Sequence, residues 1–384
     1  MRVLAAPDKF RGTLSAAQAA RAIATGWRRA RPSDEVEEVP MADGGEGTLD
    51  ALVDALEGER RSATVSGPLG DPVQADYGLV DTPEGRTAVV EMAAASGLAL
   101  IGRHRRDPRR ATSRGTGELL LAACRTDPPP RRAIVCIGGS ATNDGGAGMA
   151  QALGVRLLDG EGRPLGPGGA ALLRLARVDV SGLAREVRSV AVVVASDVDN
   201  PLVGPEGASA VYGPQKGAFP EDVFLLDRAL RHYAAVLHRD LGIDVRDQAG
   251  AGAAGGLGAG LIAFLGARLR PGVEVVMEAV GLQPRIERAD LVVTGEGRFD
   301  GQSLRGKTAA GVLAAAGEAA VPVAVVCGQA EEGVGPEGVP VASLAGRFGM
   351  ERAMQDTRRA LEELTAELAA SVGIPPGPEE AGSR

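Results

Sequence analysis

The chain contains 384 residues, of which 44% are hydrophobic, and it carries a formal net charge of −8. This length exceeds the usual limit of a single hydrophobic core, so we expect two domains or one large α/β unit. The acidic balance argues against a nucleic-acid partner, because nucleic-acid binding requires a basic surface that displaces counterions from the phosphates.

Short apolar runs alternate with helical patterns along the chain. Residues 3–6 form the first predicted strand, and a helix is predicted over residues 16–30, where Ser15 and Gln18 have capping-box spacing. Further strands are predicted at residues 87–92, 133–137, 190–195, 291–294 and 321–327, and a last helix at residues 350–372. Continuous apolar strands are typical of a parallel sheet buried on both faces, so the alternation predicts an α/β fold.

The cysteines indicate a reducing compartment. Cys124, Cys136 and Cys327 are odd in number and lack the close spacing of a zinc or dithiol site. The apolar run near the amino terminus is too short for a signal peptide, so we expect a cytoplasmic protein. The uncharged residues 248–267 include seven glycines and few large apolar side chains, which is a poor match to a bilayer, so we expect no membrane partner.

Lysine and asparagine are scarce and concentrated in glycine-bearing loops. The only lysines are Lys9, Lys216 and Lys307, although Lys and Arg together number 42, and the only asparagines are Asn143 and Asn200. Lysine is a compact, mobile point charge suited to following a phosphate that moves during a reaction. These residues therefore indicate functional loops, with codon bias as the alternative.

Residues 43–52 (DGGEGTLDAL) and 144–153 (DGGAGMAQAL) share a pattern that predicts the start of a helix. Converging glycine amides and a helix amino terminus could hold an anionic group. The alternative is a pair of ordinary helix starts with Asp as the cap, and the local sequence leaves both interpretations open.

Two stretches match nucleotide-binding patterns in an unfavourable context. Residues 301–308, GQSLRGKT, match Walker A, but the predicted strand ends at Thr294, too far before Gly301, and no apolar strand ending in Asp follows. Residues 250–255, GAGAAG, match the dinucleotide fingerprint, but no buried strand precedes them. We expect neither a P-loop fold nor a nicotinamide site, although Lys307 can still contact phosphate.

Four loops combine acids, cations and flexible backbone: PDKFRGT from Pro7, GGSATNDGG from Gly138, SDVDNP from Ser196 and TGEGRFDGQSLRGKT from Thr294. Phosphoryl transfer requires this mixture of metal-binding carboxylates, cations and phosphate-binding amides. Asp197 and Asp199 follow a predicted strand, where open α/β sheets bind ligands, and could bind magnesium or accept a hydroxyl proton; turn formation is the alternative. None of the three histidines lies in these loops.

The sequence resembles the class I glycerate kinases over nearly its whole length. Six segments in order carry the likeness: APDKFRGTLSA, PMADGGEGTLDAL, ATSRGTGELL, IGGSATNDGGAGMAQALG, SDVDNPLVGPEGASAVYGPQKGA and DLVVTGEGRFDGQSLRGKT. Arg11 and the pair Thr308-Ala309 depart from the common pattern of the family. The resemblance implies Mg²⁺-dependent transfer of phosphate from ATP to D-glycerate, most simply at the 2-hydroxyl. Phosphorylation at the 3-hydroxyl, another small hydroxy acid as acceptor, a non-catalytic binding protein of the same fold and an NAD-dependent oxidoreductase remain alternatives.

The resemblance also implies two α/β domains with the active site in a cleft. We expect a flavodoxin-like, three-layer domain from residues 1–80 and 288–375, an inserted α/β domain from residues 81–287, and a disordered tail at residues 376–384. The sequence leaves the oligomeric state open, a homodimer included.

Roles follow from the resemblance as hypotheses. Lys9, Asp197 and Asp8 are the candidate catalytic residues, with Lys9 offsetting phosphoryl charge and Asp197 receiving the acceptor proton. Ser113, Arg114 and Arg11 are the candidate glycerate contacts. The nucleotide is assigned to Gly138, Gly139, Ser140, Asn143, Asp144, Lys216, Glu296 and Lys307. Asp43 and Asp199 are the candidate magnesium ligands.

Overall fold

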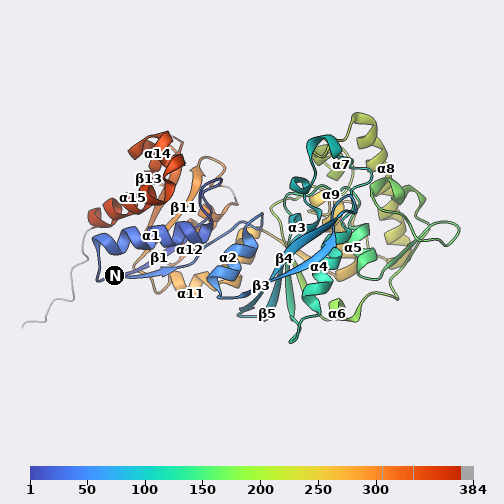
Figure 1. Cartoon of the computed structure of the whole chain (residues 1–384), viewed down its shortest axis with the longest axis horizontal. Helices are drawn as coiled ribbons and strands as arrows, with labels where there is room; N and C mark the ends of the chain where they lie inside the picture. The colour runs from blue at the N-terminus through green and yellow to red at the C-terminus, as the bar shows by residue number, and fades with distance from the viewer. Residues whose placement is uncertain (305, 332, 373–384) are drawn as a thin grey trace, which may run out of the picture. The chain divides into compact units, whose positions relative to one another are not determined.

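The computed structural model describes residues 1–304, 306–331 and 333–372. They form two compact units: Met1–Met41 joins the described part of Leu282–Arg384 in unit 1, and Ala42–Gly281 forms unit 2. Figure 1 shows the elements of both units, coloured from blue at the amino terminus to red at the carboxyl terminus. The predicted tail at residues 376–384 and the predicted domain end at residue 375 lie outside the described residues.

Unit 1 is built on a parallel five-stranded sheet. Its strands are β1 (Arg2–Pro7), β2 (Glu35–Glu38), β11 (Leu291–Phe299), β12 (Val323–Ala330) and β13 (Val341–Ser343), in the spatial order β13-β12-β11-β1-β2. Counted along the chain, this is the 2-1-3-4-5 order of flavodoxin-like sheets. The predicted flavodoxin-like α/β fold is therefore confirmed for this unit.

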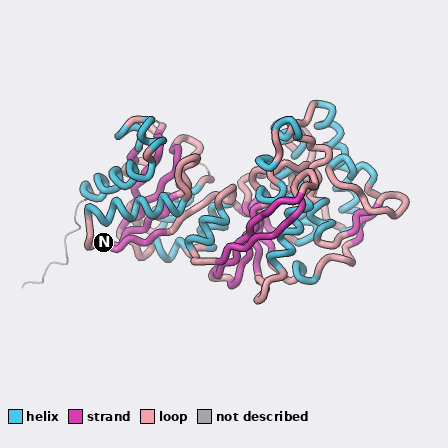
Figure 2. The backbone as a smooth tube through the Cα atoms, viewed as in Figure 1, coloured by secondary structure: helices cyan, strands magenta, loops and turns pink. Residues whose placement is uncertain are grey.

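Helices cover both faces of that sheet (Figures 1 and 2). The helices of unit 1 are α1 (Ala16–Ala30), α11 (Leu282–Ile286), α12 (Thr308–Glu318), α13 (Leu344–Phe348), α14 (Met350–Gln355) and α15 (Thr357–Ser371). One core packs Val3, Ile23, Trp27 and Leu361 together, from β1, α1 and α15. A smaller core on the other face joins Ala309 of α12 to strands β11 and β12. The result is the three-layer arrangement expected for parallel strands buried on both faces.

Unit 2 contains a mixed six-stranded sheet. Its strands are β3 (Glu59–Ser66), β4 (Pro72–Thr82), β5 (Gly85–Glu91), β6 (Arg132–Cys136), β9 (Ala191–Ala195) and β10 (Arg268–Arg270), in the spatial order β10-β9-β6-β5-β4-β3. Strands β5, β6, β9 and β10 run parallel, whereas β4 is antiparallel to both of its neighbours. The carboxyl ends of the four parallel strands therefore share one edge of the sheet.

The helices of unit 2 lie on both faces of this sheet and in a second core. They are α2 (Thr48–Ala55), α3 (Ala93–Ser96), α4 (Arg114–Cys124), α5 (Ala147–Ala152), α6 (Arg185–Arg188), α7 (Ala208–Tyr212), α8 (Pro220–Leu241), α9 (Ala253–Leu265) and α10 (Gly272–Ala279). Side chains of α4, α5 and α9 pack on one face of the sheet. Helix α2 contacts β5, and helix α10 contacts β9. The second core joins α7, α8 and α9 to a hairpin of β7 (Arg156–Leu158) and β8 (Arg177–Asp179).

The first predicted domain boundary differs from the structure. The chain passes from unit 1 to unit 2 after Met41, not after residue 80. The reason is strand pairing: β3 pairs with β4, and β4 pairs with β5, so these two strands extend the sheet of unit 2. Helix α2, which precedes them, packs on β4 and β5. The return to unit 1 falls at Leu282, six residues before the predicted position.

Two predicted element boundaries were wrong. The last helix is broken at Asp356 into α14 and α15. Strand β11 continues from the predicted end at Thr294 to Phe299, because residues 296, 298 and 299 pair in register with β12. Gly301 therefore follows the end of its strand by two residues, so the Walker-like stretch does come directly after a strand, contrary to the prediction.

Other local predictions are confirmed. Helix α1 has the predicted bounds, and Ser15 and Gln18 form the predicted capping box. Residues 243–252 form no strand before the GAGAAG stretch. A Cβ atom on Gly252 would lie 2.1 Å from the carbonyl oxygen of Pro201, and one on Gly255 would lie 1.9 Å from that of Thr142, so the absent side chains allow close backbone contacts at both positions. The glycines of this stretch thus serve packing.

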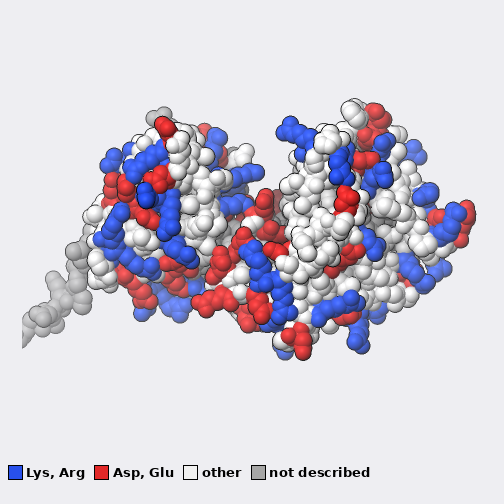
Figure 3. All heavy atoms as spheres, in the orientation of Figure 1, with Lys and Arg blue, Asp and Glu red and all other residues white. Residues whose placement is uncertain are grey.

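The described residues include no helix long and apolar enough to cross a membrane. The three cysteines are buried free thiols. On the face shown in Figure 3, acidic and basic side chains are interspersed over both units.

Candidate active site

In unit 1, the candidate residues gather where the strand order reverses. Strands β1 and β11 are neighbours that connect to opposite sides of the sheet, and the carboxyl ends flanking such a switch point are the usual ligand site of an open α/β sheet. Asp8 and Lys9 follow β1, while Glu296 lies in the last part of β11. The structure therefore brings these three predicted residues to one edge of one sheet.

Asp8 is the centre of a buried hydrogen-bond group at this edge. Its backbone N–H donates to the Gly295 carbonyl (2.8 Å), which ties β1 to β11. The Thr308 hydroxyl donates to Asp8 Oδ2 (2.6 Å), and the Lys9 backbone N–H donates to Asp8 Oδ1 (2.6 Å). Lys307 is the N-cap residue of α12, directly before Thr308. The amino end of α12 is thus fixed against the end of β1.

Glu296 has an unusual electrostatic environment. Burial raises its pKa to about 7; Ser303 and Lys307 oppose this shift, and the negative charges of Asp8 and Asp300 add to it. Its Oε1 atom is buried and accepts no hydrogen bond from the described residues. Near neutral pH this carboxyl group can therefore hold or release a proton.

In unit 2, the predicted acids lie at the shared carboxyl edge of the parallel strands. Asp197 follows β9, and its Oδ1 accepts the backbone N–H of Gly272 (2.8 Å), the first residue of α10. Although the residue as a whole is exposed, partial burial of its carboxylate raises its pKa. The Gly272 amide opposes this shift, while Asp43 and Glu274 reinforce it. The structure thus places Asp43 close enough to Asp197 for their charges to interact.

The two DGG segments do begin helices, as predicted, and both helix amino ends already hold carboxylates of the protein. Helix α2 begins at Thr48, and Glu91 Oε1 accepts the N–H groups of Gly47 (2.9 Å) and Leu49 (2.8 Å). Before α5, Asp144 accepts the N–H groups of Gly146 and Gly148, each at 3.2 Å. The structure therefore favours ordinary helix starts over anion sites, but the N-cap residues are Gly47 and Gly146, not the predicted Asp.

The loop after β6 presents only its first residues to solvent. Gly138 and Gly139 are exposed, whereas Ser140, Asn143 and Asp144 are buried. Asn143 donates through Nδ2 to the Ser209 hydroxyl (2.9 Å), inside the protein. The predicted phosphate contact is therefore accessible at Gly138 and Gly139, and in this structure Asn143 and Asp144 support the loop from within.

Lys216 is also buried, with 2% of its surface exposed. Its ammonium group donates to the Ser140 hydroxyl and to the Thr142 carbonyl, each at 2.7 Å. Burial lowers the pKa of Lys216 to about 7, and the charge of Asp144 opposes this shift. Lys216 therefore holds the loop of residues 138–144 from inside, where the sequence had suggested contact with the triphosphate.

Ser113 has a structural position. Its backbone N–H and its hydroxyl both donate to Asp144 Oδ2, at 2.8 and 2.9 Å, and the hydroxyl accepts the N–H of Met149 (3.0 Å). Ser113 is fully buried. The structure thus gives its side chain partners within unit 2, not the glycerate carboxylate that the sequence suggested.

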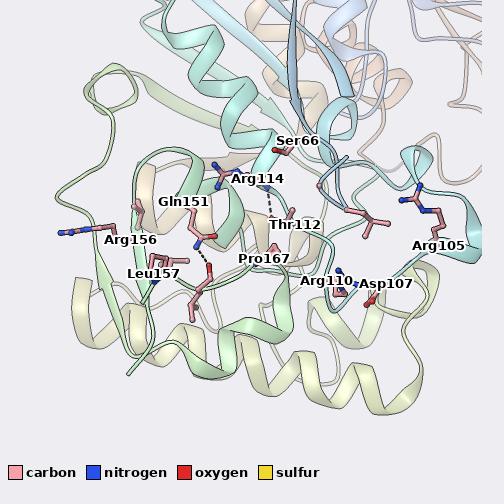
Figure 4. Close-up of a pocket in the computed structure, with 15 residues that line it drawn as sticks. Ser66, Arg105, Asp107, Arg110, Thr112, Arg114, Gln151, Arg156, Leu157 and Pro167 are labelled. Atoms are coloured by element: carbon pink, nitrogen blue, oxygen red, sulfur yellow. Dashed lines mark hydrogen bonds between the residues drawn. The ribbon is translucent and has the colours of Figure 1, made fainter. Parts of the chain in front are cut away.

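Arg114 lines a pocket of about 700 Å³ (Figure 4). Three further arginines, Arg105, Arg110 and Arg156, line the same pocket, against one acidic residue, Asp107. Neither Asp197 nor any residue of the 138–144 loop lines it. The structure therefore does not bring Arg114 together with the other predicted residues of unit 2. The remaining predicted glycerate contact, Arg11, is exposed in unit 1, where its backbone nitrogen lies near Gly297.

The predicted magnesium ligands, Asp43 and Asp199, have different surroundings. Asp43 Oδ1 accepts the N–H of Gly45 (3.1 Å) within its own turn. Asp199 is exposed beyond the end of β9 and acts on Tyr212, whose pKa is raised mainly by burial. Within the described ranges, no three Asp, Glu, His or Cys side chains are arranged to hold a metal ion.

Sequence reasoning missed three residues that shape these edges: Thr308, Glu91 and Gly272. The position of Thr308 directly after Gly-Lys was a usable signal, since a hydroxyl there is part of the Walker pattern. Glu91 and Gly272 act through contacts with residues more than 40 positions away, and their local sequence gives no such signal.

Comparisons with known proteins agree with this organisation. The model of the glycerate kinase family matches residues 3–373. A glycerate kinase of Bacillus subtilis is 47% identical over 97% of this chain and 98% of its own, and a glycerate 2-kinase of Escherichia coli is 48% identical over 87% of each. The crystal structure of a candidate glycerate kinase 2 from Salmonella typhimurium LT2 matches with a TM-score of 0.88 and 44% identity, over 97% of this chain and 98% of that one. The chain belongs to the glycerate kinase family.

Proposed function

We propose that this protein transfers the γ-phosphoryl group of ATP to the 2-hydroxyl of D-glycerate, giving 2-phosphoglycerate. One observation carries the proposal beyond family membership. Asp8, Lys9, Glu296 and Lys307 meet at the switch point of a flavodoxin-like sheet. Such an edge binds ligands, and these side chains supply the opposite charges that phosphoryl transfer requires.

On the nucleotide side, the cations of unit 1 offset negative charge. Lys9 follows β1, and Lys307 lies at the amino end of α12, an 11-residue helix whose free N–H groups favour anions. In the transition state, charge spreads over the oxygens of the transferred group. We assign Lys9 to that group and Lys307 to the phosphates that remain on the nucleotide.

On the acceptor side, Asp197 is the proposed base of unit 2. When the 2-hydroxyl oxygen bonds to phosphorus, its proton passes to the Asp197 carboxylate, and the bond between the γ-phosphorus and the bridging oxygen breaks. Burial and the nearby acids raise the pKa of Asp197, which makes it a better base than an ordinary aspartate. The exposed amides of Gly138 and Gly139 at the same sheet edge are the proposed phosphate contacts.

Arg114 is the second candidate acceptor contact. The carboxylate and the 2-hydroxyl of glycerate lie on adjacent carbon atoms, so Arg114 can bind the carboxylate only if the acceptor occupies the arginine-lined pocket, away from Asp197. A guanidinium group matches a carboxylate through two parallel hydrogen bonds. In this structure Arg114 pairs with Glu118 at 2.9 Å, and both side chains are partly exposed, so the pair is weak and a substrate carboxylate can replace it. Ser113 is left out of the substrate site because its hydroxyl is engaged with Asp144 and Met149.

Magnesium, when bound to the nucleotide, would neutralise phosphate charge and orient the transferred group. Mg²⁺ accepts one or two protein oxygens and takes its other ligands from water and phosphate. The carboxylates and hydroxyls at both sheet edges fit that requirement chemically, although no three acidic side chains cluster within the described residues.

An assay of ADP release tests the proposal. With ATP and Mg²⁺, we expect release to depend on D-glycerate and to fall to background with 3-hydroxypropionate, which lacks the 2-hydroxyl. Release that is independent of D-glycerate, or faster with another hydroxy acid, would replace the proposed acceptor.

A further inference from the structure

The Walker-like stretch has a structural context that its sequence did not reveal. Strand β11 ends at Phe299, Gly301 follows after one residue, Lys307 caps α12, and Thr308 is the first residue of that helix. A strand, then a glycine-rich loop, then a helix that begins at Lys-Thr is the order in which this motif binds nucleotide phosphates elsewhere. The order of strands in the sheet is flavodoxin-like, so the likeness is local.

A second part of that arrangement comes from the other end of the chain. Strand β1 is apolar, pairs in parallel with β11 through Pro7 and Gly295, and is followed at once by Asp8. In P-loop enzymes, the metal is held by the hydroxyl after the lysine together with an Asp at the end of an apolar strand. From the sequence, such a strand was expected only after the motif, whereas the structure places it beside β11.

The Thr308 hydroxyl and the Asp8 carboxylate are hydrogen-bonded to each other. The Thr308 hydroxyl donates to Asp8 Oδ2 at 2.6 Å, although the residues are 300 positions apart, and both are buried, with 1% and 9% of their surfaces exposed. A threonine hydroxyl that gives its hydrogen to a carboxylate keeps its oxygen lone pairs for a cation. The bond therefore leaves the hydroxyl oxygen chemically able to bind a cation.

We infer that Thr308 and Asp8 hold the magnesium ion of the nucleotide. The inference rests on the proposed function, because the phosphates of ATP supply further ligands. It places the metal in unit 1, whereas the sequence had assigned it to Asp43 and Asp199 of unit 2. Lys307 and the amino end of α12 adjoin Thr308, so phosphate and metal meet at one end of one helix.

The experiment uses the full chain with ADP and Mn²⁺ as the probe for Mg²⁺. Electron paramagnetic resonance measures free Mn²⁺ and hence its affinity for the enzyme–ADP complex, without turnover of glycerate. Thr308→Val removes the hydroxyl at nearly constant volume, and we expect it to weaken Mn²⁺ binding at least about tenfold, the scale found when a metal site loses a supporting group. Thr308→Ser keeps the hydroxyl and is expected to retain most of the affinity.

Thr365→Val is the matched control, since Thr365 is a buried threonine of α15, away from this edge. It is expected to leave Mn²⁺ affinity unchanged. Asp8→Asn gives an independent test that does not depend on the folding of Thr308→Val. Mn²⁺ and ADP together should raise the Tm of the wild-type protein, and we expect a smaller rise in Asp8→Asn. Wild-type Mn²⁺ affinity in Thr308→Val, or its loss in Asp43→Asn or Asp199→Asn instead, would overturn the inference. If Mn²⁺ binding depends on Thr308 but D-glycerate is not phosphorylated, the metal site stands and the proposed function fails.

Discussion

The Lys216 ammonium group lies 2.7 Å from the Ser140 hydroxyl and donates a hydrogen bond to it inside unit 2. The same group donates to the Thr142 carbonyl, so one side chain holds two positions of the loop after β6. This loop carries Gly138 and Gly139, the proposed phosphate contacts. The buried lysine thus holds the part of the loop that directly follows these two glycines.

The pH dependence of stability should report this burial. The pKa of Lys216 is about 7 in the folded protein and near its ordinary 10.5 in the unfolded chain. Between these values the unfolded chain binds more protons, so this lysine makes stability rise with pH, by up to ~1.4 kcal/mol per pH unit. Below about pH 7 the cost of burying the charge is fully present.

Lys216→Met removes that contribution. Urea unfolding of both proteins between pH 7 and pH 9.5 measures it as a difference in slope. We expect the free energy of unfolding to rise less steeply with pH in the variant. Equal slopes would mean that folding does not lower the pKa of Lys216.

Ser113→Ala should reduce stability and leave glycerate binding intact. The substitution removes one hydrogen bond to buried Asp144 and leaves the Met149 N–H without its acceptor. We expect the free energy of unfolding to fall by about 1–3 kcal/mol. Urea denaturation measures the loss, and KM for D-glycerate is expected to stay constant. A large rise in KM with little change in stability would restore Ser113 to the substrate site.

Lys9→Met should slow turnover while the fold survives. Lys9 is partly exposed after β1, so its removal opens no cavity in the core. Loss of a cation facing the transferred phosphoryl group should reduce kcat by roughly 10²- to 10³-fold. Steady-state kinetics measures the effect, and circular dichroism melting checks the fold. Near-normal turnover in a folded variant would remove Lys9 from the site.

Arg114→Gln tests whether the arginine-lined pocket of unit 2 binds the acceptor. If Arg114 binds the glycerate carboxylate, loss of its charged hydrogen bonds should raise KM for D-glycerate by roughly 10-fold or more, with a smaller effect on KM for ATP. Arg163→Gln is the control, since Arg163 is exposed and does not line the pocket. Unchanged KM in Arg114→Gln would show that this arginine-lined pocket is not the acceptor site.

The sequence predicted best what is decided locally. Helix α1 was located correctly because Ser15, Gln18 and the apolar spacing are all nearby in sequence. The buried parallel strands were found because their apolar runs are continuous. The hairpin of β3 and β4 was missed, since the strand residues 59–66 are mostly polar, and the first domain boundary was therefore placed too late.

Burial at the candidate site could not be read from the sequence. The stretch of residues 138–146 is rich in Gly, Ser, Asn and Asp, a composition typical of an exposed loop. In the structure, α8 and α9, more than 70 residues later, pack near it: Tyr233 of α8 approaches Gly145, and Gly260 of α9 approaches Gly146. Because of this tertiary contact, Asn143 and Asp144 are buried and form hydrogen bonds inside the protein. The contact between Asp8 and Thr308 likewise joins residues too distant for any local pattern.

Phosphorus NMR of the product tests the central claim most directly. After incubation of the protein with ATP, Mg²⁺ and D-glycerate, the account predicts one new phosphomonoester resonance that matches 2-phosphoglycerate, together with ADP. A resonance of 3-phosphoglycerate would contradict the proposed position of attack, and the absence of any phosphorylated glycerate would contradict the proposed function itself.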